Sequence, residues 1–371
     1  MPRTLRTIPL LALTALLLPA VPDSSAQQLD ALDPEIFSAL EYRHIGPVGN
    51  RVSAVVGVPG DPNIYYLGAA SGGVFKSVDG GIHWEPVFDD QPVASIGALA
   101  IDPVNPNVVW AGTGETFIRS NISHGNGIYK STDAGQSWRR MGLDATGRIG
   151  RIVIHPNDPD IVFAAALGHA YGPQPERGVF RSTDGGDTWE RVLFVDERTG
   201  AADIVMDPNN PEVLFAGMWQ LEIWTWGRES GGTGSGLWTS RDGGETWEEL
   251  TGNGLPDKPI GKIGLAMTPD DSNRIYALIE TNSNGDFAEL DDHAGVLWRS
   301  DDGGQSWRMV NADHTLAQRP LYYTRAAVAP DDRDEIHFMS TRHSVSLDGG
   351  LTIERGTAGG DNHDMWIDPR L

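Results

Sequence analysis

The octapeptide STDGGDTW, residues 182–189, is the strongest indication of the fold, because closely similar strings recur along the chain. The other copies are SVDGGIHW at 77, STDAGQSW at 131, SRDGGETW at 240, SDDGGQSW at 300 and SLDGGLTI at 346. Consecutive copies begin 46 to 60 residues apart, a spacing typical of an array, a solenoid or a propeller. Gly and Asp tolerate left-handed backbone angles, and an Asp carboxylate can accept hydrogen bonds from turn N–H groups. We therefore expect hairpin turns with structural aspartates, namely Asp79, Asp133, Asp184, Asp242, Asp302 and Asp348.

The octapeptide lies within a larger repeating unit. Around the third copy, the segments 147–156, 158–168, 178–186 and 188–194 contain short β-branched or aromatic runs bounded by Pro, Gly, Asn and Asp. Such runs are typical of strands joined by turns, and four antiparallel strands per unit of about 50 residues make a propeller blade. The sequence predicts an all-β propeller of six complete blades. The last stretch, DNHDMWIDPRL (361–371), matches the inner strand of a seventh blade, which suggests that further blades or domains of a longer parent chain follow.

The N-terminus and the composition predict where the protein works. Arg3 and Arg6 precede an apolar run with a small-residue cleavage site, so residues 1–26 read as a signal peptide and 27–40 as a polar linker to a propeller over 41–371. The expected location is secreted or periplasmic. The chain has no cysteine, so a large core must stabilise it. A net charge of −23 argues against nucleic acid, and no later segment suggests membrane insertion.

The octapeptides resemble the Asp-box, or bacterial neuraminidase repeat. Together with the stretches 42–81 and 165–189, they make the chain similar to secreted bacterial sortilin-like and xyloglucanase-like propellers over residues 41–371. The sortilin likeness implies a recognition module that binds a peptide, a protein or a polysaccharide. The xyloglucanase likeness implies a glycoside hydrolase as the alternative, although Ala70 stands where that family has its first catalytic Asp. A second alternative is an assembly or scaffold propeller.

Long loops between the second and third strands of a blade share one face with the channel mouth, and binding residues concentrate on such loops. Segment 114–127 contributes Glu115 and His124, and segment 168–177 contributes His169. Segment 218–236 contributes Trp219, Trp224 and Trp226, whose rings suit sugars or peptide side chains. The alternative for Trp219 and Trp224 is that they pack between loops.

Aligning the inner strands by their closing Pro reveals charges at a position that otherwise holds Ala or Gly. These residues are Arg151, Asp203, Arg325 and Asp364. They predict either a ligand-binding ring at the channel mouth or an ion-pair network that joins blades. The same mouth is expected to hold Tyr322, Tyr323 and His363 as binding residues. Glu115, Asp203 and Asp364 are the candidate catalytic carboxylates.

No cofactor is indicated by any motif. The string GDNHDMW places two carboxylates around His363, a composition that could bind a metal or move a proton. On an extended strand, however, Asn362 and Asp364 face one side and His363 the other, which makes a poor chelate. We therefore predict no metal site.

Overall fold

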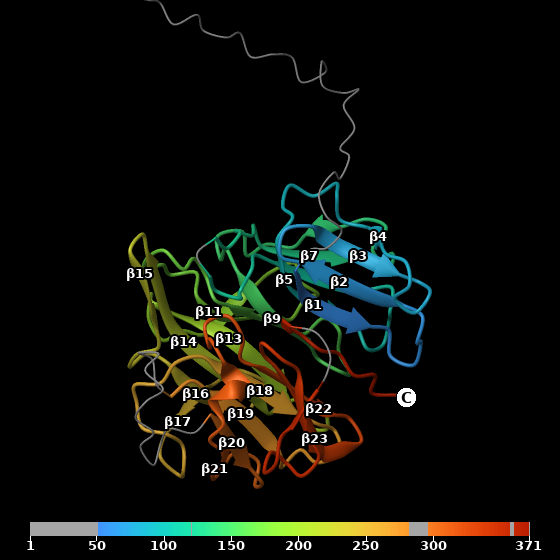
Figure 1. Cartoon of the computed structure of the whole chain (residues 1–371). Helices are drawn as coiled ribbons and strands as arrows, with labels where there is room; N and C mark the ends of the chain where they lie inside the picture. Colours follow the sequence, from blue (N-terminus) through green and yellow to red (C-terminus); the bar gives the residue numbers. More distant parts are fainter. Residues whose placement is uncertain (1–50, 120, 282–295, 357–359, 371) are drawn as a thin grey trace, which may run out of the picture. The chain divides into compact units, whose positions relative to one another are not determined.

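The computed structural model describes residues 51–119, 121–281, 296–356 and 360–370, and this part of the chain is almost entirely antiparallel sheet (Figure 1). The prediction of an all-β propeller with six four-stranded blades is confirmed. The expected signal peptide and linker lie outside the described residues. Within the described ranges, no helix has both the length and the apolar character needed to cross a bilayer.

The first three blades are regular four-stranded sheets in chain order. Blade one contains β1 (Val52–Gly57), β2 (Tyr65–Ala69), β3 (Gly73–Ser77) and β4 (Glu85–Pro86). Blade two contains β5 (Ile96–Ile101), β6 (Val109–Thr113), β7 (Ile128–Ser131) and β8 (Arg139–Arg140). Blade three contains β9 (Ile149–Ile154), β10 (Val162–Ala166), β11 (Gly178–Ser182) and β12 (Glu190–Leu193).

The last three blades follow the same order, with one addition in blade four. Blade four contains β13 (Thr199–Met206), β14 (Leu214–Trp224), β16 (Gly236–Ser240) and β17 (Glu248–Leu250), and the extra strand β15 (Gly227–Ser230) pairs with β14. Blade five contains β18 (Ile263–Met267), β19 (Ile275–Ile279), β20 (Leu297–Ser300) and β21 (Arg308–Asn311). Blade six contains β22 (Arg325–Ala329), β23 (Asp332–Met339), β24 (Ser344–Ser346) and β25 (Glu354–Arg355), preceded by the short 3₁₀ helix η2 (His314–Ala317).

The hydrophobic core lies between neighbouring blades. Consecutive inner strands contact one another, from β1 to β5 and onward through β9, β13, β18 and β22. The cluster between blades one and two is typical, with Tyr66, Ile96 and Tyr129 fully buried. Because the inner strands are apolar on both faces, the charged side chains that do occur there need partners.

Each octapeptide forms the hairpin between the third and fourth strands of its blade, as predicted. In the second copy, Ser137 donates from both N and Oγ to the Asp133 carboxylate, at 2.9 and 2.6 Å. Ser131 Oγ donates to Asp133 at 2.7 Å and accepts from Gly135 N at 2.8 Å. These donors lower the pKa of Asp133 to about 2, so the carboxylate is committed to the turn.

A basic side chain then clamps each of the last five hairpins to the preceding blade. In the first five blades it donates to the carbonyl of the fourth residue of the next octapeptide. The five pairs are Lys76 to Ala134, Lys130 to Gly185, Arg181 to Gly243, Arg241 to Gly303 and Arg299 to Gly349, at 2.8 to 3.1 Å. The repeated sequence therefore fixes both the hairpin and its contact with the neighbouring blade.

The segment 218–236 differs from the expected loop. β14 continues through Trp224 and turns back as β15, so a two-stranded hairpin extends beyond blade four (Figure 1). The reason is alternation: Trp219, Leu221 and Ile223 are buried, while the residues between them are partly exposed. A period of two is that of a half-buried strand rather than a loop.

The expected inner strand at the C-terminal end is not formed over residues 361–370. The segment instead contacts blade one through its side chains. Asp364 accepts from Val55 N at 3.1 Å, Asp368 accepts from Gly60 N at 2.9 Å, and the Trp366 ring meets Tyr65 edge-on with centroids 6.0 Å apart. Asp364 also reaches β22 through Arg325, so this segment contacts blade one and blade six.

Candidate functional site

The four charged residues found by aligning the inner strands form one network in the channel. Arg151 Nε lies 2.8 Å from Asp203, and Asp364 lies 3.6 Å from Arg151 and 3.4 Å from Arg325. Leu265 N, on the next inner strand, donates to Asp203 at 3.0 Å. The network therefore spans blades three to six and the C-terminal segment.

Burial and charge act against each other in this network. Burial alone would raise the pKa of Asp203, but Arg151 and Arg325 hold it below its usual value. Burial, followed by the charge of Arg151, lowers the pKa of Arg325, which also donates to Gly150 O at 2.7 Å. Asp203 is 1% exposed, whereas a quarter of the Arg151 side chain remains exposed. The geometry favours the ion-pair network over the ligand ring, and ligand binding by Arg151 and Arg325 stays a prediction.

Glu115 lies at the mouth, buried among arginines. Arg51 contacts both of its carboxylate oxygens, at 2.5 and 3.2 Å, and Arg119 Nε lies 3.3 Å away. The Glu115 side chain is 1% exposed. A general acid must reach the bond it cleaves, so this position suits holding the loop better than catalysis.

His363 lies in a cage of aromatic rings. Phe117, Tyr322 and Tyr323 surround it, with ring centroids 4.6, 4.7 and 5.5 Å away. Its Nδ1 lies 3.0 Å from Asp361 O, and among the described residues its Nε2 has no partner. Burial lowers the pKa of His363 to about 4, so the ring is neutral at physiological pH. The Tyr323 hydroxyl donates to Asp361, which closes one side of the cage.

His124 and His169, which come from the loops of two neighbouring blades, lie against each other. Their ring centroids are 5.2 Å apart, and Tyr171 lies 5.7 Å from His124. Arg148 packs against Tyr171 at 5.7 Å from the ring centre. Burial lowers the pKa of His124, and so do the charges of Arg148 and His169.

The three tryptophans of blade four have different surroundings. Trp219 is fully buried and donates to Ser230 Oγ at 3.1 Å. Of the two roles expected for it, ligand binding and packing, its position fits packing. Trp224 is partly exposed and donates to Glu222 at 3.0 Å. Trp226, at the tip of the β14–β15 hairpin, is 86% exposed.

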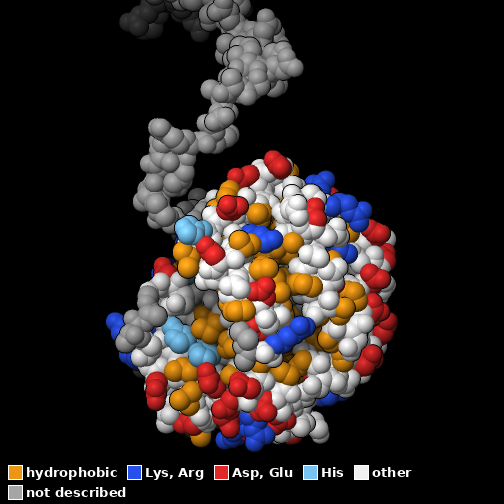
Figure 2. Space-filling model, turned by 90° about the vertical axis from the view of Figure 1, so that its right-hand side faces the viewer, with side chains coloured by type: hydrophobic (Ala, Val, Ile, Leu, Met, Phe, Trp, Pro, Cys, Tyr) orange, Lys and Arg blue, Asp and Glu red, His pale blue; other side chains and the backbone are white. Residues whose placement is uncertain are grey.

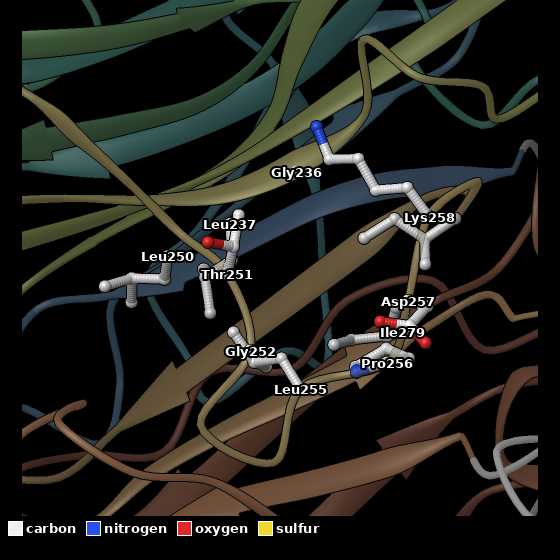
Figure 3. A pocket seen from close by; sticks show the side chains of 11 residues that line it. Gly236, Leu237, Leu250, Thr251, Gly252, Leu255, Pro256, Asp257, Lys258 and Ile279 are labelled. Atoms are coloured by element: carbon white, nitrogen blue, oxygen red, sulfur yellow. The ribbon is translucent and has the colours of Figure 1, made fainter.

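A polar hollow of about 410 Å³ lies beside this hairpin. It is lined by Trp224, Arg228, Glu229, Ser230, Gly231, Gly232 and Pro259. Arg198 fixes the hairpin by pairing with Glu222 at 2.6 Å and Glu229 at 2.9 Å. A second hollow, of about 200 Å³, lies between Leu237, Leu250, Leu255 and Ile279, with Lys258 at its edge (Figure 3). It is mainly apolar and Lys258 is paired with Glu249, so it offers fewer polar groups for orienting a ligand.

Sequence reasoning missed Lys262, which is buried at the mouth. Its ammonium lies 5.1 Å from the Trp219 ring centre and 5.4 Å from that of Phe117, and burial lowers its pKa to about 7. The signal was present, because GKIG (261–264) repeats GRIG (147–150) at the start of an inner strand. In the described ranges no group of three or more His, Asp or Glu could hold a metal ion.

Figure 2 shows how side chains are distributed on one face of the propeller. Hydrophobic side chains occupy much of its middle, with basic ones between them, and acidic side chains gather toward the edge. Together with the clusters above, these observations define a class: an Asp-box β-propeller whose mouth carries buried ion pairs, aromatic rings and an exposed tryptophan hairpin.

Comparison with known proteins places the chain within a family. The Sortilin-Vps10 model, described as sortilin, neurotensin receptor 3, matches residues 125–285 and 177–348, which together exceed half of the chain. The chain belongs to the Sortilin-Vps10 family, as its resemblance to sortilin-like propellers implied.

Curated relatives include a xyloglucanase of Paenibacillus sp, 26% identical over 293 residues, covering 72% of this chain and 26% of the relative. The xyloglucanase Xgh74A of Acetivibrio thermocellus is 25% identical over 260 residues, covering 60% of this chain and 28% of the relative. The chain thus spans about a quarter of the length of these proteins.

Two solved structures share the fold at low sequence identity. The GH74 enzyme of Niastella koreensis superposes with a TM-score of 0.60 at 21% identity, covering 80% of this chain and 45% of that one. YCF48 from Cyanidioschyzon merolae superposes with a TM-score of 0.52 at 15% identity, covering 85% of this chain and 88% of that one.

Proposed function

We propose that this chain is a recognition propeller that binds a polysaccharide on the face carrying the β14–β15 hairpin. The observation that carries the proposal is the exposed Trp226, at the tip of the hairpin, beside the polar hollow of Trp224, Arg228 and Glu229. Aromatic rings stack on sugar faces, while charged groups beside them hydrogen-bond to hydroxyls. The xyloglucanases among its relatives support a polysaccharide over a peptide.

The same geometry supports binding rather than hydrolysis. Hydrolysis of a glycosidic bond needs two carboxylates that reach opposite sides of that bond. Glu115 and Asp203 are buried beneath their arginines, and Asp364 joins Arg325 and Arg151. Ala70, at the position where xyloglucanases are expected to carry their first acid, is buried and its N donates to Arg51 O at 2.9 Å. Export through the predicted signal peptide, residues 1–26, belongs to this proposal, because it would bring the chain to extracytoplasmic polysaccharides.

The test is a binding and turnover screen on the purified chain. Soluble xyloglucan, mixed-linkage β-glucan and acidic polysaccharides are compared by affinity electrophoresis and calorimetry, and reducing ends are assayed in parallel. We expect polysaccharide binding without new reducing ends. Trp226→Ala should weaken that binding about tenfold or more, since aromatic anchors that become buried on binding dominate interfaces. Ile82→Ala is the matched control, because Ile82 is also a largely exposed hydrophobic residue, at 75%, but lies on an Asp-box hairpin.

Three results would overturn the proposal. If the chain bound peptides from a panel but none of the polysaccharides, it would be a peptide receptor. Reducing ends that accumulate with the unaltered chain would make it a hydrolase. Polysaccharide binding that Trp226→Ala and Ile82→Ala reduce equally would remove the hairpin from the binding surface.

A further inference from the structure

Three equivalent cations stand at the channel mouth, one in every second blade. Arg51, Arg148 and Lys262 each precede the inner strand of blade one, three or five. Each accepts, through its carbonyl, a hydrogen bond from the residue that follows the second strand: Ala70 N, Leu167 N and Glu280 N, at 2.9 to 3.0 Å. The three side chains therefore leave the backbone at the same place in the repeat, and their surroundings can be compared directly.

Two of the three cations are satisfied by the protein. Arg51 forms the two-pronged pair with Glu115 and also lies 3.4 Å from Tyr322 Oη. Lys262 donates to Tyr323 O at 2.8 Å and to Leu321 O at 3.5 Å, both from the next blade. Their environments explain them as structural groups.

Arg148 is different. Its side chain is completely buried, and the one hydrogen bond that its guanidinium makes within the described part of the chain runs from Nη1 to Gly168 O at 3.4 Å. Among the described residues, Nε and Nη2 have no partner and no acid lies within ion-pair distance. A buried guanidinium left in this state is unfavourable unless something else completes it.

The two unpartnered nitrogens belong to one edge of the guanidinium. Nε–H and the adjacent Nη2–H point in parallel and form the fork that matches the two oxygens of a carboxylate. Side chains from two loops lie near the guanidinium. Tyr171 from blade three packs against it, and burial and then the charge of Arg148 lower the pKa of His124 from blade two and of His169 from blade three. His124 is exposed and Tyr171 is 48% exposed, so both side chains are free to change rotamer, and that is the movement by which a ligand would reach the buried fork.

The arginine site is continuous with the tryptophan hairpin. Ile223 N, one residue before Trp224, donates to Ala170 O at 2.6 Å, and Ala170 lies between His169 and Tyr171. Tyr171 and Trp226 are both exposed rings, one on each of these joined segments. A sugar chain that stacks on the hairpin therefore passes beside the loop that covers Arg148.

We propose that Arg148 binds the carboxylate of a uronic acid residue in the polysaccharide ligand, with His124, His169 and Tyr171 lining the site. The inference rests on the proposed function and adds the acidic character of the ligand. An anion suits this site despite the charge of −23 on the chain, because the guanidinium is charged and has no carboxylate paired with it among the described residues. The carboxylates of Glu115 and Glu176 also act on the site, the first on Arg148 and the second on His169, and a bound anion must outweigh them. The positive charge of the Arg148 guanidinium disfavours binding of a metal ion between the two imidazoles.

The experiment compares acids with their neutral esters. Galacturonate oligosaccharides and the same oligosaccharides as methyl esters are titrated into the unaltered chain by calorimetry. We expect the acid to bind about 10- to 100-fold more tightly than the ester, the range that hydrogen bonds to a charged group contribute. Arg148→Gln should abolish that preference, and His124→Ala should reduce it. Arg139→Gln is the matched control, since Arg139 is exposed on an Asp-box hairpin and pairs with Asp187.

The outcomes separate this inference from the proposed function. Equal binding of acid and ester, both weakened by Trp226→Ala, would keep polysaccharide binding and overturn the role of Arg148. Both the inference and the proposed function would be overturned if the chain bound peptides with a free C-terminal carboxylate but bound neither the corresponding peptide amides nor any sugar. A preference for the acid that survives Arg148→Gln would place the carboxylate elsewhere. Should Arg148→Gln fail to fold, the acid-to-ester ratio of the unaltered chain and of His124→Ala still decides the matter.

Discussion

Asp203 is the residue whose replacement best distinguishes an inter-blade ion-pair network from a ligand site. Its carboxylate accepts from Arg151 on blade three, from Leu265 N on blade five and from Ile204 N on its own blade, at 2.8 to 3.1 Å. Removing one partner of a buried ion pair costs about 3–5 kcal/mol. In Asp203→Asn the amide oxygen keeps one acceptor, and Asp364 remains 3.6 Å from Arg151. We therefore expect a loss near the lower end, about 3 kcal/mol.

The assay is urea unfolding followed by tryptophan fluorescence, together with thermal unfolding. A loss of about 3 kcal/mol corresponds to roughly 6–12 °C on the scaling for domains of 150–250 residues. A double-mutant cycle with Arg151→Met should give a coupling energy of about 2 kcal/mol, because the two side chains are in direct contact. Asp187→Asn, in an exposed pair with Arg139, is the control and should change stability by about 0.5 kcal/mol or less.

One result would refute the structural role of this network. If Asp203→Asn unfolds at the same temperature as the unaltered chain but no longer binds polysaccharide, the four charges form a ligand site. Zero coupling between Asp203 and Arg151 would likewise show that the contact does not stabilise the fold.

Two further predictions concern the repeated hairpins. Hydrogen bonds lower the pKa of five octapeptide aspartates to about 2, below the value of about 3.9 in unfolded chains, so their stabilisation is complete above pH 4 and lost as the pH falls toward 2. Melting temperatures recorded between pH 5 and pH 2 should fall steeply, and Asp133→Asn should flatten that fall; a flat profile in the unaltered chain would contradict this. Gly186→Ala should cost about 2 kcal/mol in urea unfolding, because Gly186 has φ +97° and a Cβ there would meet the Trp110 indole. Gly227→Ala, where a Cβ meets nothing, should be neutral, and equal effects at the two glycines would contradict the packing argument.

The fold could be predicted because its determinants are local and repeated. Ser, Asp and Gly within eight residues fix each hairpin, and six copies leave little freedom in the number of blades. The alignment by closing Pro also predicted Arg151, Asp203, Arg325 and Asp364 as one group, and they do contact one another. Position in the repeat is enough to place such residues.

The environment of each side chain could not be predicted in this way. Trp219 and Trp224 occur in one string, yet strand alternation buries the first and leaves the second partly exposed. Glu115 pairs with Arg51, which lies 64 residues earlier, and no local pattern in either segment predicts that contact. Sequence patterns locate the channel mouth, whereas burial there depends on contacts between distant blades.

The comparison of equivalent positions shows why Arg148 is not simply another structural cation. A structural role predicts that the side chain finds acceptors, as Arg51 does in Glu115 and Lys262 does in the carbonyl of Tyr323. At Arg148 the loops of blades two and three supply two imidazoles and a phenol ring instead. Burial lowers the pKa of Arg148 only to about 10, so the group remains charged at neutral pH. A group that is buried, charged and, among the described residues, unpaired along its carboxylate-binding edge is best explained by an acceptor that comes from outside the chain.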